Sequence, residues 1–254
     1  MRPGVMVAGS LGVTALILAA FASQRSFQAP AGRFPGLDGL SPSQAGHLAL
    51  ASLTLAALLG VLLQLIRRTG DLTIPLGSLG ALGGYFFFAP PLKWGRRGWG
   101  EAVGGLCFGL LPVAAGFYLQ CGHFVTEVLI YGLPLTFAAF NLFLIQGFPG
   151  PAAGEGQSRH TLAERLGPVA GALIYTLINI LAIIGLLLGF LFPASPLPFR
   201  HALLLLVLLA VVNQELIKRK VYREERGLRS LGLLTLTLHL GMGSVFVLML
   251  AARM

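Results

Sequence analysis

Charged residues are scarce in this chain of 254 residues, of which only 11% are Asp, Glu, Lys or Arg. An ordinary soluble domain carries about 25%. Hydrophobic residues make up 56% of the chain, and the mean hydropathy is +0.81. A soluble fold of this size needs far more polar surface to cover its core. The composition therefore excludes a soluble domain and a disordered chain.

Cysteine is almost absent, since the chain contains only Cys107 and Cys121. Two cysteines cannot form the framework of a disulfide-rich secreted scaffold, which is thereby excluded. Both lie in or beside apolar runs, so we interpret them as small buried hydrophobic residues and not as a redox pair.

Acidic residues are half as frequent as basic ones, 9 against 18, and the net charge is +9. In a soluble protein this excess would suggest nucleic acid as a partner. In a membrane protein, basic residues more often fix the orientation of the chain. We therefore expect the lipid bilayer, and not nucleic acid, as the main partner.

Apolar runs dominate the sequence, and a helix needs about 20 such residues to cross a bilayer. The runs predict an all-α, polytopic membrane helix bundle of about eight transmembrane helices, because only helices and closed barrels satisfy their backbone in lipid and these runs are too long for barrel strands. We expect a single transmembrane domain over residues 1–254. The third and seventh runs are short or interrupted by Pro and Gly. The eight runs are 5–22, 45–66, 72–89, 101–119, 124–148, 166–192, 202–217 and 231–252.

Basic residues are distributed unevenly over the connections between these runs. The connections 23–44, 90–100, 149–165 and 218–230 hold 13 of the 18 basic residues. Cytoplasmic loops carry such an excess, so the pattern predicts a multi-pass protein with both termini on the non-cytoplasmic side. Residues 20–22, Ala-Phe-Ala, also look like a signal-peptidase site. Whether residues 1–22 are retained is therefore left open.

Two stretches of the chain are more specific than composition. Residues 85–101 read YFFFAPPLKWGRRGWGE, and residues 145–167 read IQGFPGPAAGEGQSRHTLAERLG. The first resembles a tyrosine-led segment ending in PPLxxxxRGxGE in the UbiA family of intramembrane aromatic prenyltransferases, particularly its menaquinone- and chlorophyll-synthase-like branch. The second matches, without a gap, the family segment INEFPDYEADKAVGKRTLAVRLG. A weaker match, GLSPSQ, covers residues 39–44.

The resemblance implies a helical bundle, usually of nine spans, that transfers a polyprenyl group from its diphosphate to an aromatic acceptor. Two Asp-rich motifs of the family hold Mg²⁺, which holds the diphosphate. The chain departs from the family at both motifs. The second motif's two aspartates fall on Gly150 and Gly154, and its preceding Asn-Glu falls on Gln146 and Gly147. The first would fall within residues 20–30, which contain no acid, and the family's first helix is missing.

Basic and aromatic residues of the two matching segments are better preserved. The resemblance places a cluster of basic residues at the cytoplasmic mouth, where it would bind an anionic headgroup or a diphosphate, or would only set the topology. The cluster comprises Lys93, Arg97, Arg159, His160 and Arg165. The aromatic run Tyr85, Phe86, Phe87 and Phe88 resembles the wall that shields a prenyl cation in the family. Here the aromatic run would line a tunnel for an isoprenoid tail, or it would simply pack against lipid.

Isolated polar residues inside the later runs have a simpler interpretation. We expect Asn141 and Asn179 to form hydrogen bonds between helices. We expect His239, in the middle of the last run, to be a neutral imidazole bonded to a carbonyl of a neighbouring helix.

The favoured hypothesis is a catalytically degenerate UbiA homologue that has no metal site and no catalytic residue. Such a protein would serve as a membrane subunit or as a holder of isoprenoid-tailed molecules such as a quinone, pigment, carotenoid or lipid. It needs no cofactor, and its partners would include a larger membrane complex. The alternative is an active Mg²⁺-dependent prenyltransferase of quinone or chlorophyll biosynthesis that uses atypical ligands such as Glu155 and Asp38. An unrelated transporter is the weakest of the three hypotheses, because the ungapped match is long.

Overall fold

The structure, a computed structural model, describes residues 42–88, 91–148, 161–191 and 197–251. Within them every regular element is a helix and no strand forms, as the apolar runs predict. The principal helices are α2 (Pro42–Arg67), α3 (Thr73–Phe88), α4 (Gly100–Phe108), α5 (Leu110–Cys121), α6 (Thr126–Gln146), α7 (Leu162–Leu166), α8 (Pro168–Leu191), α9 (Leu197–Lys218) and α10 (Glu225–Ala251). Short 3₁₀ turns span Trp94–Arg96 and Val221–Arg223.

Among the described residues, four helical segments are long and apolar enough to cross a membrane. They are residues 100–121, Thr126–Gln146, Pro168–Leu191 and Phe199–Lys218. Their lipid-compatible character is visible in their side chains, because large apolar residues such as Leu173, Leu188 and Leu205 remain at least 58% exposed. Exposed apolar surface on this scale needs lipid or another protein to cover it. The first predicted span, residues 5–22, lies outside the described residues.

The helices differ from the predicted runs at three places. The fourth run is interrupted at Gly109, which separates α4 from α5. The third run gives the 16-residue helix α3, shorter than the ~20 residues that span a bilayer. The predicted loop 218–230 is largely helical, because α9 continues to Lys218 and α10 already begins at Glu225. These two helices continue beyond their apolar regions into polar residues. Hydropathy alone does not locate such polar helix ends.

The chain divides into two compact units, which we describe separately. The first comprises residues 1–93 and 115–123. In its described part, α2 packs against α3, and Tyr118 ties their connection by accepting a hydrogen bond from the Leu72 amide at 3.1 Å. Gly70 has a φ of +118°, and a β-carbon there would meet the Tyr118 ring. Only glycine fits this close approach without strain.

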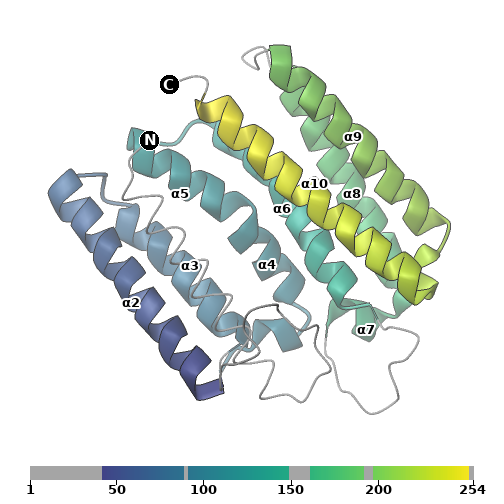
Figure 1. The fold of residues 1–254 in the computed structure, drawn as a ribbon, viewed down its shortest axis with the longest axis horizontal. Helices are drawn as coiled ribbons and strands as arrows, with labels where there is room; N and C mark the ends of the chain where they lie inside the picture. Colours follow the sequence, from purple (N-terminus) through teal and green to yellow (C-terminus); the bar gives the residue numbers. More distant parts are fainter. Residues whose placement is uncertain (1–41, 89–90, 149–160, 192–196, 252–254) are drawn as a thin grey trace. The chain divides into compact units, whose positions relative to one another are not determined.

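The second unit, residues 94–114 and 124–254, contains a bundle built around α6. Helix α6 contacts α4, α8 and α10, and α9 contacts both α8 and α10. Figure 1 shows α9 and α10 side by side in green and yellow. Two apolar clusters fill this bundle, one around Tyr131, Leu186 and Met242 and the other around Leu144 and Tyr175.

Glycines allow the close packing of α4 and α8 on α6. A β-carbon on Gly104 would lie 2.6 Å from the Phe143 ring, and one on Gly109 would collide with the Thr136 backbone. On α8, a β-carbon on Gly185 would lie 2.5 Å from Pro134. Small residues at these positions therefore let the helix backbones approach closely.

Candidate functional site

Parts of the two segments that carry the family resemblance, residues 94–101 and 161–167, meet in the second unit. The segment before α4 contributes Arg97, and the first turn of α4 contributes Glu101. The short helix α7 contributes Leu162 and Arg165. The Arg165 guanidinium donates a hydrogen bond from Nη1 to the Arg97 carbonyl oxygen at 2.8 Å. These bonds join two segments that lie about 65 residues apart in the sequence. The two matches to the family therefore describe parts of one local structure.

Glu101 is the buried acid of this junction, with only 4% of its surface exposed. Its Oε1 accepts a hydrogen bond from the Leu162 backbone amide at 2.9 Å. The amides at a helix start have no partner within the helix, so the carboxylate satisfies one of them at the start of α7. The RGxGE segment therefore supplies the anchor for α7.

The glycines of the same segment explain its spacing. Gly98 has a φ of +77°, and a β-carbon there would lie 3.1 Å from the Arg165 guanidinium. A β-carbon on Gly100 would lie 2.8 Å from Gly95 Cα. Glycine at these two positions lets the turn fold tightly while Arg165 crosses it.

Helix α7 begins with a capping box. Thr161 Oγ1 accepts a hydrogen bond from the Glu164 amide, and the Glu164 carboxylate accepts one from the Thr161 amide, each at 3.4 Å. Thr161 Oγ1 also donates to the Gly147 carbonyl at 3.1 Å. This hydrogen bond joins the end of α6 to the start of α7. The Thr-x-x-Glu pattern of residues 161–164 is the sequence signal that marks this helix start.

The predicted site residues are distributed over both units. Arg97 and Arg165 share the junction described above, with both side chains exposed. Lys93 belongs to the first unit, as do Tyr85, Phe86 and Phe87 on α3. Tyr85 is 56% exposed, and its ring packs edge-on against Phe86 with a centroid distance of 5.2 Å. Arg159, His160, Gly150 and Gly154 lie outside the described residues, as does the Phe88 side chain.

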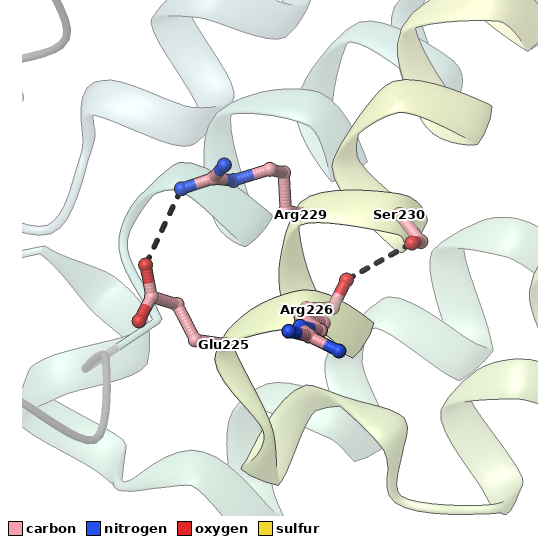
Figure 2. Close-up of polar contacts among 4 residues, drawn as sticks. All are labelled: Glu225, Arg226, Arg229 and Ser230. Carbon is pink, nitrogen blue, oxygen red and sulfur yellow. Dashed lines mark hydrogen bonds and ion pairs between the residues drawn. The ribbon is translucent and has the colours of Figure 1, made fainter.

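The basic connection between α9 and α10 carries both free and paired cations. Arg219 pairs with Glu215 at 2.9 Å and Arg229 with Glu225 at 3.3 Å, each one helical turn apart. Figure 2 shows the Glu225–Arg229 pair and the Ser230 hydroxyl, which donates to the Arg226 carbonyl. Such exposed pairs add little stability. We find no feature here beyond a basic surface suited to anionic headgroups.

The isolated polar residues of the later helices confirm their expected roles. Asn141 donates to the Tyr175 carbonyl at 3.2 Å, and Asn179 donates to the Ala210 carbonyl at 2.9 Å. The His239 imidazole is hydrogen-bonded to the backbone of Leu135 on α6. The two cysteines are free, but Cys121 is exposed and Cys107 is only partly buried. The prediction that both are buried was therefore wrong, because Cys121 ends α5 next to the Gly122 turn.

Magnesium, the metal that the resemblance implies, does not fit the described donor set. Within the described ranges no group of three or more His, Cys, Asp or Glu side chains lies close enough to hold a metal ion. Glu101, Glu164, Glu215 and Glu225 each have a hydrogen-bond or ion-pair partner in the protein. A β-carbon on Gly147 would lie 2.8 Å from the Thr161 side chain, so a glutamate has no room there unless Thr161 moves.

These observations define a class, a helical protein of the membrane with lipid-facing apolar helices around a glycine-packed bundle. A comparison with family profiles then gives the family: residues 38–250 match the UbiA prenyltransferase family. The match covers most of the chain, which belongs to this family. Searches of curated proteins and of solved structures gave no significant match.

Proposed function

We propose that this protein is a UbiA-family member that has lost the Mg²⁺–diphosphate chemistry and holds an isoprenoid-tailed molecule in the membrane as a subunit of a larger complex. The ligand class comprises quinones, pigments, carotenoids and polyprenyl lipids. The replacement of the family's carboxylates by Gly150 and Gly154 is the single observation that carries this proposal.

Ionisation of a prenyl diphosphate requires that the negative charge of the leaving group be neutralised by metal ions. Mg²⁺ is held in such sites by carboxylate oxygens and phosphate oxygens in octahedral geometry. The second family motif offers glycine at both aspartate positions, and the window of residues 20–30 offers no acid. The closed contact between Gly147 and Thr161 supports the same conclusion, since it occupies the space that an acidic side chain at position 147 needs.

An aromatic surface on α3 of the first unit and an exposed basic residue of the second unit each support a holding function on their own. Tyr85, Phe86 and Phe87 give α3 an aromatic surface, and the Arg97 side chain is free to meet an anion because only its carbonyl is used by Arg165. An apolar tail gains from aromatic and aliphatic contact without any ionisation step.

Native mass spectrometry and lipid extraction of the protein purified from its own membrane test this proposal. We expect a stoichiometric isoprenoid-tailed lipid. Tyr85→Ala should reduce its occupancy several-fold, and Arg97→Ala should do so for a ligand with an anionic head. Leu65→Ala is the matched control, because Leu65 is also exposed, at 68%, in the same unit. Only ordinary bilayer phospholipids at wild-type and variant proteins alike would contradict the proposal.

A transfer assay separates holding from catalysis. Wild-type protein in proteoliposomes, supplied with Mg²⁺, a polyprenyl diphosphate and an aromatic acceptor, should form no prenylated product. Magnesium-dependent product that disappears in Glu155→Ala or Asp38→Ala would establish the alternative, an active transferase with atypical ligands.

A further inference from the structure

A layer of polar side chains crosses the second-unit bundle at one level. Each of the four long helices α6, α8, α9 and α10 contributes to it from its buried face. Its members are Asn141, Asn179, Asn213, Gln214 and Thr235, each at most 9% exposed. We call this set the polar layer.

The polar layer separates the two apolar clusters of the bundle. On α6, Asn141 lies between Ala138 of the first cluster and Leu144 of the second. On α9, Asn213 lies between Ala210 of the first cluster and Ile217 of the second. On α8 and α10 a polar residue again lies between the two clusters, which follow in the reverse order along the chain: Asn179 lies between Tyr175 and Ala182, and Thr235 between Leu231 and Leu238. Since α6, α8, α9 and α10 contact one another in a ring, the polar residues occupy one cross-section of the bundle.

Hydrogen bonds within the layer satisfy part of its polar groups. Tyr175 links two helices, because its hydroxyl lies 2.8 Å from Thr235 Oγ1 and its carbonyl accepts from Asn141. Asn179 Nδ2 donates both to the Ala210 carbonyl at 2.9 Å and to Gln214 Oε1 at 3.0 Å. Both hydrogens of the Asn179 amide are therefore taken by the protein.

Four buried atoms of the layer have no hydrogen-bond partner among the described residues. They are Asn141 Oδ1, Asn213 Oδ1, Asn213 Nδ2 and Gln214 Nε2. Asn213 stands out, because it is 0% exposed and neither end of its amide is bonded. Buried polar atoms are rarely left unpaired, and inside a membrane neither lipid nor bulk water can supply the partner.

The chemistry of these atoms selects the missing partner. Two of the four are donors and two are acceptors, so the partner must both accept and donate. A metal ion cannot satisfy an amide N–H, and a hydrocarbon tail can satisfy neither kind of atom. Water does both, and buried water in proteins usually makes about three hydrogen bonds.

We propose that the polar layer is an internal water site, with ordered water bound at Asn213 between the two apolar clusters. The water bridges the unpaired amide groups of α6 and α9 and thereby completes hydrogen bonding across the bundle. The site is independent of the proposed tail-holding function.

Water-edited solid-state NMR of the wild-type protein in proteoliposomes tests the site directly. With ¹⁵N-labelled asparagine, magnetisation is transferred from water to the side-chain amides at short mixing times. We expect the Asn213 amide to receive it several-fold faster than the Asn179 amide, whose donors are both bonded within the protein. Asn213→Ser and Asn179→Ser identify the two signals. In a second, uniformly labelled sample, sequential backbone assignment from Val212 identifies Asn213 without a variant. Build-up at Asn213 no faster than at Asn179 would overturn the proposal.

Discussion

Single glycine residues allow helices of this protein to pack closely, because they carry no β-carbon at the contact. Gly109→Ala should destabilise the protein by about 1–3 kcal/mol, because the added methyl collides with the Thr136 backbone, which has no freedom to move aside. Unfolding by SDS titration in mixed micelles measures the change.

Gly243 on α10 provides the matched control, since a β-carbon there meets nothing within 4 Å. Gly243→Ala should be neutral or stabilise by up to about 1 kcal/mol through helix propensity. Equal losses for both variants would show that the packing between α4 and α6 is not the cause.

Glu101 makes a second prediction at this scale. Glu101→Ala removes the acceptor of the part-buried Leu162 amide and should cost about 1–3 kcal/mol. Glu101→Gln keeps a carbonyl oxygen at the same place and should lose less. Thermal unfolding in detergent compares them with Glu225→Ala, whose exposed ion pair should contribute about 0–1 kcal/mol. An effect of Glu225→Ala as large as that of Glu101→Ala would contradict the assigned anchor.

Single elements depend on contacts that lie outside their own sequence, and α7 is the clearest case. A five-residue helix is too short to form alone, so it relies on its capping box and on Glu101. Thr161→Ala removes the cap and the bond to Gly147 and should cost about 0.5–2 kcal/mol. Hydrogen exchange of the α7 amides should accelerate. Thr237→Ala, whose hydroxyl only bonds Leu233 of its own helix, should leave that exchange unchanged.

The existence of most elements could be predicted from the sequence, but some of their ends could not. Hydropathy locates α6 and α8 closely, because their whole length is apolar. It misses the first turns of α10, where Glu225 and Arg229 are helical but charged. It also misses the break at Gly109, which is set by the approach of Thr136 from another helix. The junction of Arg97 with Arg165 depends on tertiary structure, so local pattern could name its residues but not join them.

The orientation of the whole molecule in the membrane rests on its loop charges, and Cys121 offers a native probe of it. Cys121 is exposed at the end of α5, in a connection that the charge pattern places outside the cytoplasm. A membrane-impermeant maleimide should label it in intact cells, and Cys121→Ser should remove the signal. In that background, Ser230→Cys should be labelled only after permeabilisation. The reverse pattern would invert the predicted topology.

The contact between Gly147 and Thr161 bears on how this protein can evolve. An acidic side chain at position 147 alone would push against Thr161, which caps α7 and bonds the Gly147 carbonyl. Under the proposed loss of the Mg²⁺ site, regaining a ligand at this position would require a simultaneous change at position 161 and a new cap for α7. A structural role acquired by one residue would then block the reversal of another.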